Sequence, residues 1–209
     1  MLNDSGEYDQ IAENIYAPIY PVIAEMILRR TGVNQGSLLD IGCGGGHLAF
    51  ALLAKGDFQA VLADIREDAL RIAIDRGQRA GWAEKFSVSC QDVQNMDFAD
   101  NHFDLIVSRG SMPFWTDQPR AFREIYRVLA PGGQAYIGGG MGSKQLRAQI
   151  LDKMDTDSKS CFEHIKKISL SLTNQQYYDL FAQLTPRFEI IENDGEGRWL
   201  HFGKEANDD

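Results

Sequence analysis

The sequence has few cysteines, no long apolar run and no basic tract, and each of these absences excludes a class of protein. Its three cysteines, Cys43, Cys90 and Cys161, are too few and too widely spaced for a disulfide framework or a Cys-x-x-Cys metal site. No stretch approaches the roughly eighteen consecutive apolar residues of a membrane-spanning helix. Residues 1–9 lack the basic start and apolar core of a secretory signal. We therefore expect a cytoplasmic protein without a metal centre or a membrane segment.

Positive charge is scarce and scattered. Lysine and arginine number 21 against 30 aspartates and glutamates, which gives a formal net charge of −9. Nucleic-acid-binding proteins usually carry a basic stripe, because neutralising phosphates supplies much of their affinity. The densest basic clusters here are two pairs, at positions 29–30 and 166–167, so we do not expect a nucleic acid as partner. A length of 209 residues suits one α/β domain with a full core, and we expect residues 1–209 to form a single domain.

Glycine, in contrast, is concentrated after one short apolar stretch. Residues 38–41 (Leu-Leu-Asp-Ile) are followed by glycines at positions 42, 44, 45 and 46 and then by an apolar run of helical spacing. This order is typical of a buried parallel strand that turns sharply into a helix. Glycines at such a turn permit positive φ and close approach of a ligand, and the first N–H groups of the helix are donors. The sequence therefore predicts a ligand-binding turn, with a plain tight turn as the alternative.

The glycine spacing narrows the class of ligand. A dinucleotide fingerprint, G-x-G-x-x-G, needs a third glycine where this chain has His47, and a phosphate-binding loop needs a Gly-Lys-Ser/Thr ending that is absent. The pattern Asp-x-Gly-x-Gly-x-Gly instead resembles motif I of the class I S-adenosylmethionine-dependent methyltransferases. The resemblance implies S-adenosyl-L-methionine as cofactor and S-adenosyl-L-homocysteine as product. It assigns this motif's residues to cofactor binding: Asp40, Gly42, Cys43, Gly44 and Gly46.

Two later strand ends extend this resemblance. Residues 59–64 are an apolar stretch ending in Asp64, about twenty positions after the glycine turn, where an acid suits ribose hydroxyls. In the family this acid, here Asp64 with the adjoining Ile65, binds the adenosine; the alternative is an N-cap for the next helix. After the strand expected at 86–90, Asp92 and Val93 resemble the family's contacts to the adenine amine and to a ring nitrogen. The alternative for Asp92 is turn chemistry alone.

The fourth expected strand, residues 103–108, leads to the region that the family places beside the transferred methyl group. The resemblance assigns Ser108 and Arg109 to the cofactor. It also makes Met112, Phe114 and Trp115 the expected wall of the acceptor pocket. The alternative is that these apolar side chains only fill the core.

The C-terminal half continues the pattern. A helix over about 117–128, closed by Leu-x-Pro-Gly-Gly at 129–133, resembles a further family signature. A fifth strand from 134 to 137 then enters a glycine run, whose Gly139 we assign to the acceptor side. Residues 143–187 are expected to form a helical insertion, with Thr173 and Gln176 as a capping box. Strands at 188–192 and 199–202, joined by a turn-rich link, predict an antiparallel hairpin.

The N-terminal residues 1–32 are expected to form two helical pieces that precede the first strand. They carry three tyrosines, Tyr8, Tyr16 and Tyr20, which combine an apolar body with a polar tip. One hypothesis is a flap over the ligand mouth, with Tyr16 and Tyr20 on the acceptor side. The alternative is that the tyrosines simply dock this segment onto the domain.

Together these elements predict an α/β fold, a Rossmann-like doubly wound sheet of seven strands, mostly parallel with an antiparallel C-terminal hairpin. The resemblance implies in-line transfer of a methyl group from S-adenosyl-L-methionine to a small-molecule acceptor. The alternatives are a non-catalytic S-adenosylmethionine-binding protein and, less favoured, a nicotinamide-dependent oxidoreductase. The four histidines offer no obvious general base, and Tyr16, Tyr20 and Arg109 are the other candidates. The sequence leaves the acceptor, the methylated atom and the oligomeric state open.

Overall fold

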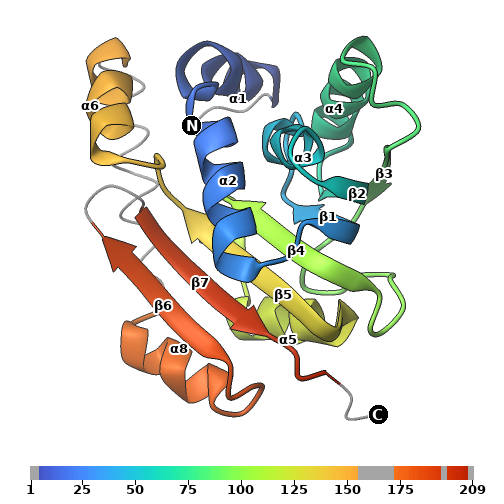
Figure 1. The fold of residues 1–209 in the computed structure, drawn as a ribbon, viewed down its shortest axis with the longest axis vertical. Coiled ribbons are helices and arrows are strands. Elements are labelled where there is room, and N and C mark those ends of the chain that lie inside the picture. Colours follow the sequence, from blue (N-terminus) through green and yellow to red (C-terminus); the bar gives the residue numbers. More distant parts are fainter. Residues whose placement is uncertain (1–4, 155–171, 194–196, 207–209) are drawn as a thin grey trace.

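The computed structural model describes residues 5–154, 172–193 and 197–206, and these form one sheet with helices on both faces (Figure 1). The seven strands in this part of the chain lie in the order β3-β2-β1-β4-β5-β7-β6. Neighbours from β3 to β5 are parallel, and β7 is antiparallel to both β5 and β6. The strands are β1 Gln35–Ile41, β2 Asp57–Asp64, β3 Phe86–Cys90, β4 Phe103–Arg109, β5 Leu129–Gly139, β6 Phe188–Asn193 and β7 Gly197–Gly203. The expected fold class is confirmed.

Two apolar cores lie on opposite faces of this sheet. Successive side chains of a strand point to opposite faces, so Leu38 and Leu39 of β1 enter different cores, and both are fully buried. The first core is covered by α2 Ile19–Thr31, α3 His47–Leu53, α4 Glu67–Arg79 and α6 Lys144–Lys153. The second is covered by α5 Gln118–Val128 and α8 Asn174–Phe181. Strands covered on both faces need continuous apolar runs, which explains the sequence of β1 and β4.

The N-terminal helices have two different environments. Helix α2 packs on α3, and its Ile19, Ile23 and Ile27 are fully buried because they recur at helical spacing on one face. This helix is therefore part of the core layer of the domain. Helix α1 Ser5–Ile11 and the π-helical turn η1 Ala12–Tyr16 precede it, and α1 contacts α4. Of the segment expected as a flap, α1 contributes no buried residue to the first core, whereas Ala12 and Tyr16 of η1 are buried in it.

The C-terminal part follows the expected pattern, except that β5 begins earlier than expected. The capping box of Thr173 and Gln176 opens α8, and the hairpin of β6 and β7 closes the sheet. The expected helices between 155 and 171, with Cys161 and His164, fall outside the described residues. Strand β5 begins at Leu129, directly after α5, so the Leu-x-Pro-Gly-Gly sequence belongs to the strand. Because β5 begins early, its pairing with β4 contains a register shift between Phe103 and Leu105.

Candidate active site

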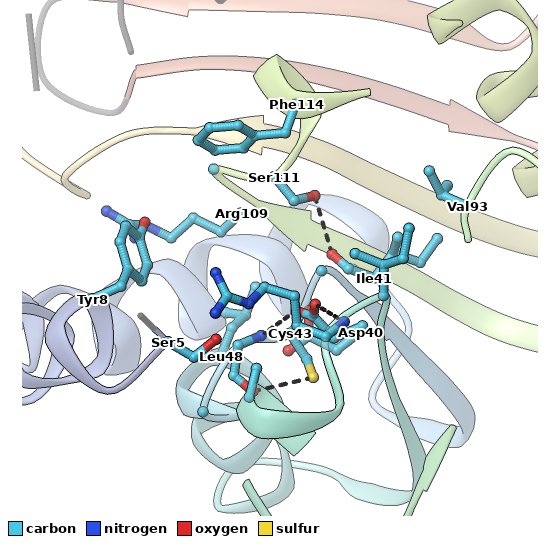
Figure 2. Close-up of a pocket in the computed structure, with 18 of the residues that line it drawn as sticks. Ser5, Tyr8, Asp40, Ile41, Cys43, Leu48, Val93, Arg109, Ser111 and Phe114 are labelled. Carbon is cyan, nitrogen blue, oxygen red and sulfur yellow. Dashed lines mark hydrogen bonds between the residues drawn. The ribbon is translucent and has the colours of Figure 1, made fainter. Parts of the chain in front are cut away.

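A cavity of about 540 Å³ lies at the carboxyl edge of the parallel strands, under α1 (Figure 2). Such edges are where open α/β sheets bind ligands, because the strand–helix loops meet there. Most of the residues assigned from the sequence line this cavity: Asp40, Gly42, Cys43, Gly44, Asp64, Ile65, Asp92, Val93, Arg109, Tyr20, Phe114 and Trp115. One cavity thus receives residues from the ends of β1, β2, β3 and β4.

The other assigned residues lie behind the wall. Gly46 is the N-cap of α3, where its φ of +80° requires glycine, and it packs against Leu62 and Phe50. Ser108 is fully buried, and its hydroxyl is 2.6 Å from the hydroxyl of Ser111, which does line the cavity. These residues shape the site from outside the cavity.

Met112, Tyr16 and Gly139 also lie outside the cavity wall. Met112 is buried in the second core, where the Tyr177 hydroxyl approaches its sulfur at 3.7 Å. The Tyr16 ring packs under the guanidinium of Arg109, 5.1 Å from the ring centroid. Gly139, at the end of β5, lies next to the backbone of Gly110. Met112 therefore has the core-filling role that was the alternative.

The glycine loop after β1 is held by backbone hydrogen bonds and by one carboxylate. The N–H groups of Gly42 and Cys43 donate to the Ala63 carbonyl at 2.8 and 3.1 Å. The Gly44 N–H donates to Asp64 Oδ2 at 2.9 Å. Gly44 has a φ of +52°, and a Cβ built there would meet no atom within 4 Å. The loop therefore presents bare backbone to the open cavity at Gly44, as a closely approaching ligand requires.

Asp64 joins this loop to the start of α4. Its Oδ1 accepts the Arg66 N–H at 3.0 Å, while the N-cap position of α4 is Arg66, which makes no side-chain cap. Asp64 therefore does not cap the helix directly. Each carboxylate oxygen has two acceptor sites, so both oxygens retain one for a ligand hydroxyl.

Asp92 is linked to the fourth strand through Gln94. The Asp92 Oδ1 accepts hydrogen bonds from the backbone N–H and the side-chain Nε2 of Gln94 at 2.9 and 3.1 Å. The Oε1 of Gln94 then accepts the Thr116 hydroxyl at 2.8 Å and the Asp117 N–H at 2.6 Å. Gln94 and Thr116 line the cavity, and neither was assigned from the sequence. A polar chain thus connects the loop after β3 with the loop after β4.

Two buried groups at the motif are shifted toward their neutral forms. Asp40 is 2% exposed, and its Oδ2 accepts the Ala49 N–H at 3.1 Å. Burial, with a smaller effect of the Asp64 charge, raises the pKa of Asp40 to about 8. Burial likewise raises the pKa of the Cys43 thiol. Both groups are therefore mainly protonated at neutral pH in this state.

His47 is held by residues of the N-terminal helices. Its Nε2 lies 3.0 Å from Asp9 Oδ1, and the Tyr20 ring stacks on it with centroids 4.9 Å apart. Burial and the nearby charge of Arg76 lower the pKa of His47, against the opposing effect of Asp9. His47 is a packed, partnered side chain, which agrees with its exclusion as a general base.

Helix α1 and the first residue of η1 contribute lining residues that were not assigned from the sequence. They are Ser5, Tyr8 and Asp9 of α1 and Ala12 of η1. Arg66, Gln91, Gly110 and Ser111 also line the cavity without having been assigned. The tyrosine pattern pointed to this segment, but nothing in the local sequence indicated the partners of Asp9.

The fold and the cavity define a class: doubly wound α/β proteins with a ligand cavity at the carboxyl edge of the sheet. The family model described as "Methyltransferase domain" matches residues 39–137. A ubiquinone/menaquinone biosynthesis C-methyltransferase UbiE from Pseudomonas entomophila is 31% identical over 136 residues, 64% of this chain and 53% of that protein. The UbiE protein of Ectopseudomonas oleovorans is 32% identical over 133 residues, 62% of this chain and 78% of that protein. The chain spans about half the length of the Pseudomonas relatives that it matches.

A solved structure extends the similarity over nearly the whole chain. It comes from Methanococcus maripaludis and is itself assigned provisionally as an S-adenosyl-L-methionine-dependent methyltransferase. It superposes with a TM-score of 0.89 and 36% identity, over 98% of this chain and 93% of that one. The chain belongs to the class I S-adenosylmethionine-dependent methyltransferase family. The expected class and its cofactor, S-adenosyl-L-methionine, are confirmed.

None of the helices within 5–154, 172–193 and 197–206 has both the length and the apolar character needed to cross a bilayer. Within the same ranges, no three His, Cys, Asp or Glu side chains are grouped so that they could hold a metal ion.

Proposed function

We propose that this protein transfers the methyl group of S-adenosyl-L-methionine to a small-molecule acceptor bound in the same cavity. One observation carries the proposal: a single cavity is lined by the glycine loop, Asp64 and Asp92 and also by Arg109, Phe114 and Trp115 from the end of β4 and the loop after it. Its volume of about 540 Å³ lies in the range of small-ligand sites. The residues present fit the cofactor, because the backbone at Gly44 faces open space and Asp64 and Asp92 supply hydrogen-bond acceptors.

The proposal gives each group at the adenosine end one role. Asp64 accepts from the ribose hydroxyls with the oxygen sites that Gly44 and Arg66 leave free. Asp92 accepts from the adenine amine, and the Val93 N–H donates to a ring nitrogen. Ile65 supports this arrangement, because it lines the cavity with 66% of its surface exposed and an adenine ring would cover it.

The chain's contribution to catalysis is alignment and exclusion of water. The cofactor supplies a methyl group on a sulfonium, and the acceptor must approach it in line. The walls formed by Phe114 and Trp115 orient the acceptor, and α1 borders the cavity with Ser5, Tyr8 and Asp9. We confine the proposed closing segment to α1, since α2 and the buried Ala12 and Tyr16 of η1 are part of the core.

The acceptor is proposed only as a small molecule. The named relatives are C-methyltransferases of quinone biosynthesis, but the chain spans about half the length of the Pseudomonas proteins, so their substrate is not transferred to it. The net charge of −9 supports a partner other than a nucleic acid. The free thiols of Cys43 and Cys90 support a reducing, cytoplasmic setting.

Calorimetry with both cofactor forms tests the proposal. S-adenosyl-L-methionine and S-adenosyl-L-homocysteine should each bind at one site, with affinities unchanged by a chelator. NAD titrated in parallel should show no saturable binding. Saturable NAD binding without binding of either sulfur compound would contradict the proposal and restore the oxidoreductase alternative.

A further inference from the structure

Arg109 differs from Arg66, the other arginine on the cavity wall, because no carboxylate in the described part of the chain pairs with it. Arg66 is engaged by Asp68 at 2.7 and 3.1 Å. Arg109 donates from Nε to the Gly140 carbonyl at 3.3 Å, and its guanidinium lies 5.1 and 5.3 Å from the ring centroids of Tyr16 and Tyr20. Among the described residues, no hydrogen-bond acceptor meets its two terminal nitrogens. The guanidinium is thus held in place with its donor ends available.

Tyr8 brings a second donor to the same place. Its hydroxyl lies over the residue that follows Arg109, since a Cβ built on Gly110 would be 3.8 Å from that oxygen. The hydroxyl has no hydrogen-bond partner within the described part of the chain, and the residue is 36% exposed. Figure 2 shows the Arg109 side chain extending from β4 toward Tyr8 of α1. A guanidinium and a phenol hydroxyl that converge in a cavity form a site for an anionic group.

The order of the strands places this site beyond the cofactor. Along the sheet edge, Asp92 follows β3, Asp64 ends β2 and the glycine loop follows β1. Arg109 ends β4 and bonds to Gly140 just after β5, on the side away from the adenosine aspartates. A cofactor laid from β3 to β1 leaves the β4–β5 side for the acceptor. An unpaired cation beside a sulfonium is also costly, and an anionic acceptor would offset that repulsion.

We propose that the methyl acceptor carries a carboxylate, and that Arg109 and Tyr8 bind it, so that Arg109 serves the acceptor and not the cofactor to which the family resemblance assigned it. The inference rests on the proposed function and names the substrate class. Two terminal guanidinium nitrogens match the two oxygens of a carboxylate, which favours this anion over a single-point partner. Phe114, 61% exposed, and Trp115 line the adjacent wall, so the body of the acceptor is apolar or aromatic. Arg109 is thereby a specificity residue.

Benzoate and its neutral analogue benzamide test this site directly. Each is titrated into the complex with S-adenosyl-L-homocysteine by calorimetry. We expect benzoate to bind about tenfold more tightly than benzamide, since the charged pair adds hydrogen bonds to an ion. Arg109→Gln should abolish the difference, and Tyr8→Phe should reduce it. Arg71→Gln removes the same charge from a side chain that is 74% exposed and outside the cavity, and it should change nothing. Equal or undetectable binding of benzoate to the wild-type complex would overturn the proposal.

A second comparison separates the acceptor from the cofactor's own carboxylate. 5′-Methylthioadenosine lacks the amino-acid end that S-adenosyl-L-homocysteine carries. Arg109→Gln should leave the ratio of the two affinities unchanged. A tenfold loss for S-adenosyl-L-homocysteine alone would assign Arg109 to the cofactor and overturn the inference. Failure of the wild-type protein to bind S-adenosyl-L-homocysteine would instead overturn the proposed function, and with it this inference.

Discussion

Asp9 and Arg76 form a two-point ion pair across 67 positions of the chain, with Nη1–Oδ1 at 3.0 Å and Nη2–Oδ2 at 2.8 Å. Asp9 lies on α1 and Arg76 on α4, and the guanidinium also donates to the Gly45 carbonyl of the glycine loop. Burial opposes the ionisation of Asp9, but Arg76 and His47 outweigh it and hold the pKa of Asp9 below its ordinary value. This pair therefore ties the helix over the cavity to the loop that builds its floor.

The first prediction concerns this tie. Asp9→Asn should speed the release of S-adenosyl-L-homocysteine several-fold, because the mutation removes a charged partner whose hydrogen bonds contribute about 1.5–3 kcal/mol. Stopped-flow tryptophan fluorescence measures the rate, since Trp115 lines the cavity. Glu13→Gln is the matched control, because Glu13 also pairs with Arg76 but its side chain is 58% exposed. Equal release rates in both variants would contradict a closing role for α1.

The second prediction separates backbone strain from the ligand's access to the loop. Gly44→Ala and Gly81→Ala both force a Cβ onto a positive φ, +52° and +80°, with no atom within 4 Å. Each should lose about 1–2 kcal/mol of stability in chemical denaturation. Only Gly44→Ala should also lose cofactor affinity, because Gly44 lines the cavity whereas Gly81, which follows α4, does not. Equal cofactor affinities of the two variants in calorimetry would show that the cofactor does not approach Gly44 closely.

The third prediction ranks the two aspartates at the adenosine end. Asp64→Ala should weaken the binding of S-adenosyl-L-methionine by about 1.5–3 kcal/mol, or roughly 10- to 150-fold in Kd, because the ribose hydroxyls lose their hydrogen-bond acceptors. Asp92→Ala should cost less, since the backbone of Val93 retains its contact. Calorimetry on both variants measures the difference. Unchanged affinity in the Asp64 variant would leave that residue only its observed role of bracing Gly44 and Arg66.

The fourth prediction follows from the raised pKa of Asp40. A carboxyl with a folded pKa of about 8 and an unfolded value near 3.8 binds more protons in the folded state between those values. Its contribution to stability is therefore full below about pH 4 and is lost as the pH rises toward 8. The ligand-free protein should lose about 2.5 kcal/mol of stability between pH 5.5 and 7.5 relative to Asp40→Asn, because one extra bound proton in the folded state costs about 1.36 kcal/mol per pH unit. Parallel pH profiles in urea denaturation would contradict this account.

The sequence predicted the parts of the site that depend on neighbouring residues. The glycine loop is one contiguous motif, and Asp64 stands at the end of a single apolar stretch, so strand and turn patterns were enough to place them. The parallel character of the sheet followed from alternating strands and helices, because parallel strands need helical crossovers. These features are local, and the fold brings them together at one edge.

The residues that the sequence placed less well depend on packing between distant elements. Asp9 reaches Arg76 only because α1 lies against α4, and no spacing rule connects positions so far apart. Ser108 and Arg109 are consecutive in a strand, so only one of them can face the cavity, and it is Arg109. In the short turn that follows, Met112 is 5% exposed and Phe114 is 61% exposed, a division set by α8 packing behind Met112.

A crystal structure with S-adenosyl-L-homocysteine bound tests the central claim most directly. The account predicts the ligand along the carboxyl edge of the sheet, with ribose hydroxyls on Asp64, the adenine amine on Asp92 and the sulfur beside β4. The β4–β5 side, with Arg109 and Tyr8, should be left open for an acceptor. A ligand bound in the opposite direction, or with its carboxylate on Arg109, would contradict the assigned division of the cavity between cofactor and acceptor.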